Sequence, residues 1–316
     1  MSAMRELAFE SCGVSCAAWH IGAESDDLRT PAGRPCVVMA HGFGGTRDTA
    51  LLPFAEGFAA AGLDVVLFDY RGFGASGGMP RQFVSYRRQR ADYRAAVAAA
   101  RALDGIDPER IVVWGTSYSG GHVLAVAAGD DRIAAAISMT PATDGLAALT
   151  AILRREGPGT LVRLTAAGLR DVAGAVAGRP PQTIPLAGMS GTLAVMADDV
   201  AGTAYPAIGG PTWRNEVTAR SALEVGLNRP VRFAARIRCP LLVQVGDVDR
   251  IAPPAAAERA ARLAGTRAEL RRYPYDHFDV YGPPGRDRVL ADQIQFLRRH
   301  LAGRAGGAAR AAPLTA

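Results

Sequence analysis

Residues 114–121, WGTSYSGG, join a short apolar run to a stretch with the composition of a helix. The run before them, RIVVW (110–114), is rich in β-branched residues, and YSGGHVLAVAA (118–128) follows. A strand that turns sharply into a helix at a serine lifts the serine Oγ above the sheet, in the arrangement called a nucleophile elbow. The alternative is a plain Ser/Gly-rich turn. A nucleophile needs partner residues, so the presence of such partners elsewhere in the chain decides between the two interpretations.

Two serines lie in this stretch, and their distance from the strand distinguishes them. The elbow needs small residues two positions before and after its serine, because the backbones of strand and helix nearly touch. Ser117 has Gly115 and Ser119 at these positions, whereas Ser119 has Ser117 and Gly121. Ser119 would already lie inside the helix, with its hydroxyl bonded to backbone. Ser117 is therefore the candidate nucleophile.

The rest of the chain alternates between strand-like runs and helical stretches. The strand-like runs are almost continuously apolar and are bounded by Gly, Pro or Asp, which indicates an α/β protein with a parallel sheet buried on both faces. An N-terminal hairpin, LAFES and SCAAWHI around Gly13, precedes them. We expect strands at 36–40, 64–70, 110–115, 132–139, 240–246 and 268–274, and helices at 48–61, 87–103, 118–129, 253–264 and 286–302.

This alternation stops after the expected strand at 132–139, which is the sixth when the two hairpin strands are counted. Two apolar helical patterns, a Pro/Gly/Met-rich stretch and a further helix follow instead, and we predict that they form a helical cap or lid inserted into the core. The Ala/Gly/Arg-rich end of the chain is expected to be a flexible tail. The predicted division is a core of residues 1–140 and 231–302, a cap of 141–230 with helices at 145–155, 159–177 and near 212–226, and a tail of 303–316.

The composition excludes several kinds of chemistry and partner. All 36 basic residues are arginines, so Schiff-base and pyridoxal phosphate chemistry, Ser–Lys dyads and Walker-type phosphate loops, which need lysine, are excluded. The net charge of +6 comes from scattered arginines rather than a basic stripe, and we expect no nucleic-acid partner. No apolar run approaches 18 residues and no secretory signal is evident, so we expect a cytoplasmic protein without a membrane span. The four cysteines lack metal-ligand spacing and are expected to be reduced and buried.

A serine needs a base, and the chain has five histidines to choose from. His20 lies in the N-terminal hairpin, and His300 lies in the last helix. His122 is one turn along the elbow helix, and His41 ends the first parallel strand. His277, in YPYDHFDVY between the last strand and the last helix, alone is placed at the carboxyl edge of the sheet where it can reach the elbow. We therefore expect His277 to be the base.

The base in turn needs an acid that fixes its tautomer. Asp247 and Asp249, in VGDVDRIAPP, follow the penultimate strand. Asp249 lies deeper in the loop and is the predicted acid, while Asp247 is expected to bond loop backbone. Asp144, in MTPATDG after the preceding strand, is the rival acid.

An acyl-transfer intermediate also needs donors for its oxyanion. One donor is expected to be the N–H of Tyr118, the residue after the serine. The other comes from HGFGG (41–45), whose glycines let a loop approach the substrate closely. Phe43 N–H is the predicted donor there, with Gly44 as the second choice.

A second glycine motif, GFGASG (72–77), fits the dinucleotide fingerprint G-x-G-x-x-G. The glycines do not open a helix, because a proline and aromatic residues delay the next helix to about residue 87. No strand ending in an acid follows at the proper distance. We therefore interpret the motif as a turn and expect no nucleotide cofactor.

Together these motifs resemble the α/β-hydrolase superfamily over about residues 34–140 and 236–302. HGFGG, FDYRGFGASGG, GTSYSGG, GDVDRIAPP and DHFDVY occur in the family's order, nucleophile then acid then histidine. The resemblance implies an eight-stranded, mostly parallel sheet flanked by helices, in which the RGFGASGG glycines form a structural loop. The wider sequence looks like bacterial α/β-fold hydrolases that are distantly similar to dienelactone-hydrolase and prolyl-peptidase-like enzymes. Ser119 departs from the family's usual glycine but is small enough to fit.

The sequence therefore predicts a serine hydrolase, free of metal and cofactor, that cleaves a small-molecule carboxylic ester through an acyl-enzyme on Ser117. A hydrophobic acyl or alcohol group is expected, and a homodimer is possible. Alternatives are a thioesterase or acyltransferase of natural-product metabolism, a prolyl aminopeptidase-like amidase with a cap carboxylate for the substrate amine, and a non-catalytic binding protein of the same fold. The apolar residues of the cap either line a pocket or only pack the cap helices onto the core; they are Leu146, Leu149, Ile152, Leu161, Leu164, Leu169, Val172, Leu186, Met189, Leu193, Met196 and Trp213. The carboxylates that the cap could offer to a substrate amine are Glu156, Asp171, Asp198, Asp199 and Glu216.

Overall fold

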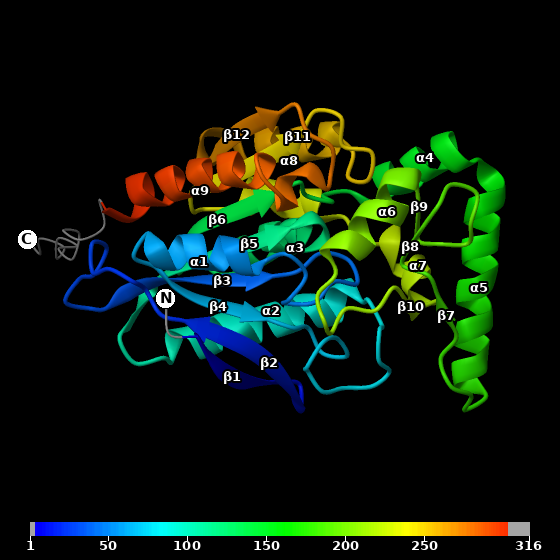
Figure 1. The fold of residues 1–316 in the computed structure, drawn as a ribbon, viewed down its shortest axis with the longest axis horizontal. Coiled ribbons are helices and arrows are strands. Elements are labelled where there is room, and N and C mark those ends of the chain that lie inside the picture. Colours follow the sequence, from blue (N-terminus) through cyan, green and yellow to red (C-terminus); the bar gives the residue numbers. More distant parts are fainter. Residues whose placement is uncertain (1–3, 303–316) are drawn as a thin grey trace, which may run out of the picture.

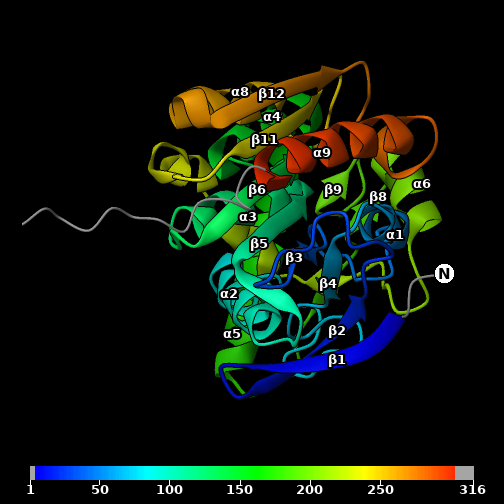
Figure 2. The same ribbon diagram turned by 90° about the vertical axis from the view of Figure 1, so that its left-hand side faces the viewer.

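The computed structural model describes residues 4–302, so the predicted tail of 303–316 lies outside the described residues. Its centre is an eight-stranded sheet in the order β1-β2-β4-β3-β5-β6-β11-β12 (Figures 1 and 2). Every strand runs parallel to the others except β2, which is antiparallel to both of its neighbours. The strands are β1 Met4–Ser11, β2 Val14–Ile21, β3 Arg34–Ala40, β4 Asp64–Phe68, β5 Ile106–Thr116, β6 Ile133–Met139, β11 Leu241–Gly246 and β12 Ala268–Tyr273.

Helices cover both faces of the sheet, as continuous apolar strands require. On one face α1 (Leu52–Ala60) contacts α9 (Gly285–Ala302). On the other face lie α2 (Tyr86–Arg101), α3 (Ser117–Ala127) and α8 (Pro254–Ala264). Strands β4, β6 and β11 are buried at every position, so the apolar runs read from the sequence form the core between these layers. The expected α/β sheet is confirmed.

The strand order changes direction at β3, between β4 and β5. After β3 the chain moves to β4 on one side, and it then returns to β5 on the other side of β3. Loops that leave neighbouring strands in opposite directions open a crevice at the carboxyl ends of those strands, where ligands bind in open α/β sheets. The loop after β3 begins at His41, and α3 after β5 begins at Ser117. The topology alone therefore brings these two segments to one crevice.

The segment between β6 and β11 groups at one end of the sheet, at the right of Figure 1. Two of its predicted helices are present, as α4 (Gly145–Glu156) and α5 (Pro158–Val176). The helix expected near 212–226 is reduced to α7 (Ser221–Val225). The segment also contains α6 (Asp199–Ile208), the connecting 3-10 helix Pro230–Arg236, and the two-residue strands β7 (Thr183–Ile184), β8 (Ala187–Gly188), β9 (Met196–Ala197) and β10 (Val217–Thr218).

Side-chain bonds explain both differences from the prediction. Asp198 accepts hydrogen bonds from the N–H groups of Val200 and Ala201, so it caps α6 within a stretch whose Gly and Pro content hides a helix. In 212–220 the Asn215 side chain bonds the N–H and the carbonyl of Ala187, and this stretch contains turns, a bend and the two residues of β10 instead of a helix. Tertiary contacts therefore override the local apolar pattern at both places.

The structure also bears on two smaller expectations, which concern the burial of the cysteines and the absence of a membrane-spanning helix. Cys16, Cys36 and Cys239 are buried, but Cys12 is exposed, contrary to the prediction that all four are buried. Cys12 and Gly13 form the two-residue turn of the β1–β2 hairpin, and both have positive φ, 49° and 75°, which places the Cys12 side chain outside the sheet. No helix among residues 4–302 has the length and apolar character to cross a bilayer.

Candidate active site

The stretch 114–121 folds as the sharp turn that its sequence predicts. Ser117 has φ 55°, a left-handed conformation that is uncommon for a residue other than glycine. A Cβ added at Gly115 would lie 2.4 Å from the carbonyl oxygen of Ser119, and one at Gly121 would lie 2.3 Å from that of Ala142. The left-handed conformation of Ser117 costs on the order of 1–3 kcal/mol and persists because the surrounding structure fixes it. It leaves Ser117 at the apex between β5 and α3.

Ser119 is bound as a structural residue of this turn. Its Oγ accepts a hydrogen bond from the N–H of Thr116 at 2.9 Å and donates to the carbonyl of Ala40 at 2.7 Å. The side chain is fully buried. The hydroxyl thus ties the first turn of α3 to the end of β3, as expected for a hydroxyl that bonds backbone.

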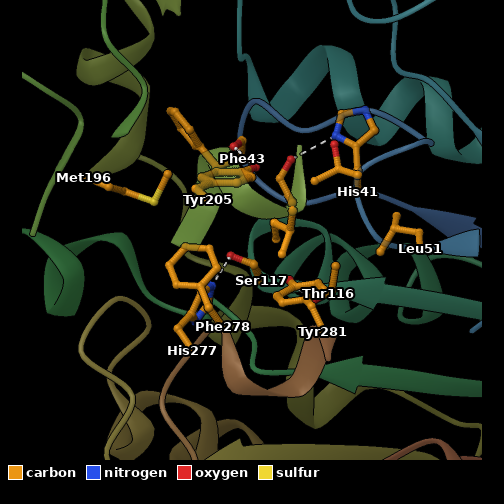
Figure 3. Close-up of a pocket in the computed structure, with 13 residues that line it drawn as sticks. His41, Phe43, Leu51, Thr116, Ser117, Met196, Tyr205, His277, Phe278 and Tyr281 are labelled. Atoms are coloured by element: carbon orange, nitrogen blue, oxygen red, sulfur yellow. Dashed lines mark hydrogen bonds between the residues drawn. The ribbon is translucent and has the colours of Figure 1, made fainter. Parts of the chain in front are cut away.

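His277 and Asp249 meet Ser117 in a continuous chain of hydrogen bonds. His277 Nε2 lies 3.0 Å from Ser117 Oγ (Figure 3), and His277 Nδ1 lies 2.8 Å from Asp249 Oδ2. The imidazole and the carboxylate are only 3% and 1% exposed. His277 follows β12 and Asp249 follows β11, so both stand at the carboxyl edge of the sheet beside the elbow. Such a chain can pass a proton from the hydroxyl to the imidazole while the carboxylate stabilises the resulting imidazolium.

The other carboxylates considered from the sequence are engaged elsewhere. Asp249 uses its second oxygen to accept bonds from Ile251 N–H and Ala252 N–H, which fixes its orientation toward the imidazole. The rival Asp144 binds Arg229 through both of its oxygens, each at 2.8 Å, and caps α4. Asp247 pairs with the exposed side chain of Arg272 rather than with loop backbone, which corrects that expectation.

The loop after β3 carries the predicted second donor and is held from two sides. The carbonyl of Gly42 accepts a bond from His41 Nδ1 at 3.0 Å, and the carbonyl of Phe43 accepts one from Tyr205 Oη at 2.8 Å (Figure 3). Within residues 4–302, no protein acceptor is bonded to the N–H of Phe43 or of Tyr118. A Cβ on Gly42 would lie 3.0 Å from the Cβ of Ser117, so glycine permits this close approach. Both N–H groups are thus free of a protein acceptor among the described residues.

His41 is a functional candidate that the sequence reasoning missed, having considered it only as a base. A carbonyl only accepts hydrogen bonds, so the bond to Gly42 requires the proton on Nδ1. Burial lowers the pKa of His41 to about 4, and the imidazole is therefore neutral at pH 7. Burial also lowers the pKa of His122, whose Nε2 bonds Gln89 Oε1 away from Ser117. The only sequence signal for His41 was its place at the end of β3, beside the glycine loop.

Two cavities of different character meet at Ser117. The smaller spans about 360 Å³ and the larger about 730 Å³, including space open to solvent, and they share Phe43, Ser117 and Met196. Of the apolar cap residues named from the sequence, four line them: Leu149, Ile152, Leu164 and Met196. The others named there do not: Leu146, Leu169, Val172 and Met189 are exposed, Leu186 is buried, and Leu161, Leu193 and Trp213 are intermediate. No group of three or more His, Cys, Asp or Glu side chains suited to a metal ion occurs in the described part of the chain.

Comparisons with known proteins identify the family and the fold of the chain. Residues 31–277 match the family described as Serine aminopeptidase, S33. The quorum-quenching protein AidA of Acinetobacter baumannii is 41% identical over 296 residues, 93% of this chain and 94% of that protein. The thiohydrolase apmlB of Arthrinium phaeospermum is 25% identical over 286 residues, 85% of this chain and 90% of that protein.

Among solved structures, the α/β hydrolase GrgF from Penicillium sp. sh18 superposes with a TM-score of 0.79. It is 23% identical, and the match covers 95% of this chain and 99% of that one, so it shows the shared fold. The family match spans most of the chain, and AidA is similar over nearly its whole length. The chain belongs to the Serine aminopeptidase, S33, family of α/β hydrolases.

Proposed function

We propose that this protein is a serine hydrolase that cleaves a carboxylic ester through a covalent acyl-enzyme. The observation that carries the proposal is the chain from Asp249 through His277 to Ser117, with bonds of 2.8 and 3.0 Å. It converges on a strained serine at the crevice of the sheet, beside two free backbone N–H groups. A nucleophile, an oriented base and oxyanion donors are the parts that acyl transfer needs.

In the first step His277 Nε2 accepts the Ser117 Oγ proton while Oγ attacks the ester carbonyl. The carbonyl oxygen becomes an oxyanion that receives hydrogen bonds from Phe43 N–H and Tyr118 N–H, each worth about a hundredfold or more in rate. The intermediate collapses as the bond to the leaving oxygen breaks and His277 returns its proton to that oxygen. An alcohol leaves, and the acyl group remains on Ser117.

In the second step a water molecule takes the place of the alcohol. His277 accepts a proton from the water as its oxygen attacks the acyl carbon, and the same two N–H groups hold the new oxyanion. Collapse returns the proton to Ser117 Oγ and releases the carboxylic acid. Throughout, Asp249 keeps the proton of neutral His277 on Nδ1, so that Nε2 is free to act as the base.

His41 is assigned a positioning role in this mechanism. The carbonyl of Gly42 and the N–H of Phe43 belong to one planar peptide unit, so a bond that fixes the carbonyl also fixes the N–H. His41 Nδ1 supplies that bond at 3.0 Å, and the Gly45 N–H supplies a weaker one at 3.3 Å. Hydrogen bonds in such a chain polarise one another, which strengthens the Phe43 N–H as a donor.

The segment 141–230 acts in this proposal as a cap over the site. Its residues form most of the wall of the larger cavity and contribute Met196, Tyr205 and Ile208 to the smaller one, and Tyr205 of α6 bonds the loop that carries Phe43. Water-excluding walls of this kind strengthen the electrostatic interactions at the site. The cap is thereby expected to set which esters enter.

Thioester cleavage is the second candidate function, and the thiohydrolase relative favours it. The AidA relative is named for quorum quenching, so signalling molecules that contain an ester bond join the candidate substrates. An aminopeptidase activity is disfavoured, because a substrate amine needs a free carboxylate. Among the described residues, the cavity walls contain one carboxylate, Asp144, and both of its oxygens bind Arg229.

Hydrolysis of matched substrates tests the proposal. Esters, thioesters and aminoacyl anilides with the same chromogenic readout are compared for wild type, Ser117→Ala and Ser119→Gly. We expect esters to be cleaved most efficiently, Ser117→Ala to be inactive, and Ser119→Gly to keep activity because it changes only a structural hydroxyl. Full activity in Ser117→Ala, or cleavage of anilides alone, would contradict the proposal.

A further inference from the structure

We infer that the two cavities divide the substrate, with the acyl chain in the larger cavity and the leaving group in the smaller one. The inference rests on the proposed function and deepens it. It assigns the hydrophobic part of the substrate to the acyl side and makes the leaving group compact. The substrate class is then an ester of a long aliphatic acid with a small alcohol.

The position of His277 decides which side holds the leaving group. In the collapse of the intermediate, the proton passes from His277 Nε2 to the leaving oxygen, so that oxygen must lie within hydrogen-bond reach of the imidazole. His277 lines the smaller cavity and does not line the larger one. The leaving group therefore occupies the smaller cavity.

The larger cavity reaches the residues that an acyl group must contact. Ser117 lines it together with Phe43 and Tyr118, the residues that carry the two oxyanion donors. An acyl carbon bonded to Ser117 Oγ, with its oxygen between those donors, has this cavity open to its chain. At about 730 Å³ the cavity has twice the space of the smaller one.

The walls of the larger cavity match a plain hydrocarbon chain. Leu149 and Ile152 of α4, Leu164 of α5, Val225 of α7 and Ile251 supply aliphatic surface. The Asp144 carboxylate in this wall is already neutralised by Arg229. An uncharged aliphatic chain gains from burial here, whereas a charged one finds no free counterion among the described lining residues.

The smaller cavity is bounded by aromatic rings that pack on one another. Ring centroids lie 5.5 Å apart for Tyr205 and Phe278, and 6.3 Å apart for Phe278 and Tyr281. The two hydroxyls are also engaged, Tyr205 with the carbonyl of Phe43 and Tyr281 with Thr116 Oγ1 at 2.6 Å. A wall fixed by ring contacts and hydrogen bonds does not readily expand for a long leaving group.

A pair of isomeric esters tests the division directly. Ethyl octanoate and octyl acetate have the same molecular formula but carry the long chain on opposite sides of the ester bond. Each methylene buried on the acyl side is expected to raise kcat/KM about threefold to fourfold. We therefore predict that ethyl octanoate is preferred by about a hundredfold or more. Equal values, or a preference for octyl acetate, would overturn the division.

A variant that narrows the larger cavity gives a second test. Ala148 lines this cavity, and Ala148→Phe is expected to lower the ratio of kcat/KM for ethyl octanoate over ethyl acetate about tenfold or more. Ala166→Phe, on the exposed side of α5, is the matched control and should leave the ratio unchanged. An unchanged ratio in Ala148→Phe would overturn the division. If Ala148→Phe does not fold, Val225→Phe in the same wall replaces it.

The outcomes separate this inference from the proposed function. An enzyme that hydrolyses both isomers but prefers octyl acetate remains a serine esterase with the opposite division. An enzyme that hydrolyses none of the esters, while folded by its thermal unfolding, contradicts the proposed function itself.

Discussion

Tyr205 of α6 donates a hydrogen bond of 2.8 Å to the carbonyl of Phe43, across 162 positions of the chain. This bond joins the segment between β6 and β11 to the loop after β3. It fixes the peptide unit between Phe43 and Gly44, whereas His41 fixes the preceding unit, between Gly42 and Phe43. The two candidate donors, Phe43 N–H and Gly44 N–H, are thus held by different side chains and can be tested separately.

The first prediction compares Tyr205→Phe with His41→Phe. If Phe43 N–H is the donor, loss of the His41 bond should lower kcat about a hundredfold, and loss of the Tyr205 hydroxyl should lower it less, about tenfold or below. Steady-state kinetics on one ester measure both. Tyr273→Phe, which removes a buried hydroxyl bonded to Gln244 and Asp292 rather than to the loop after β3, serves as the control. A larger loss in Tyr205→Phe would point to Gly44 N–H instead.

The second prediction asks whether His41 acts through its hydrogen bond or through packing. The amide of Asn can place a donor near the position of Nδ1, so His41→Asn should recover much of the kcat lost in His41→Phe. The KM should change little in either variant, because the oxyanion contact forms in the transition state. Affinity for a trifluoromethyl ketone, which forms a tetrahedral adduct on serine, should fall with kcat. Equal kcat in the two variants would leave His41 with a packing role only.

The third prediction concerns the acid. Asp249→Asn should lower kcat about ten-thousand-fold, since an amide favours the wrong tautomer of His277. Asp144→Asn is the matched control: it breaks the pair with Arg229, and we expect it to lower stability while it largely preserves kcat. Kinetics combined with thermal unfolding separate the two effects. A collapse of kcat in Asp144→Asn alone would mean that the wrong acid has been assigned.

The fourth prediction is a dependence of stability on pH. The folded-state pKa of His41 is lowered to about 4 by burial, against 6.5 for an ordinary histidine. The unfolded chain therefore binds a proton between these values that the folded chain does not, and stability is lost as pH falls from about 6.5 toward 4. The loss from His41 approaches about 3 kcal/mol. His41→Asn should show a smaller drop in unfolding free energy between pH 7 and pH 4, as measured by urea denaturation; an identical drop would contradict the assignment.

Much of the fold could be predicted because its signals are local. The strand runs are continuously apolar, and the turn at 114–121 has small residues where two backbones approach. The meeting of Ser117, His277 and Asp249 also follows from position, since each comes directly after a parallel strand and so lies at the same edge. Chain order thus carries spatial information in a parallel sheet.

Other features depend on contacts that local sequence does not encode. Helix α6 is defined by its cap at Asp198, and the non-helical stretch 212–220 is bonded to Ala187 through Asn215. The bond of His41 depends on the path of a glycine loop, and the exposure of Cys12 depends on the type of its hairpin turn. Asp249 was predicted from the sequence, but the engagement of its rival Asp144 depends on Arg229, which lies 85 positions from Asp144.

The central claim is that Ser117 forms a covalent intermediate. The most direct measurement is treatment with a fluorophosphonate, followed by digestion and mass spectrometry of the labelled peptide. We predict one adduct, on Ser117, absent from Ser117→Ala and strongly slowed in a His277 variant. An adduct on Ser119, or no adduct on a folded and ester-cleaving enzyme, would contradict the account.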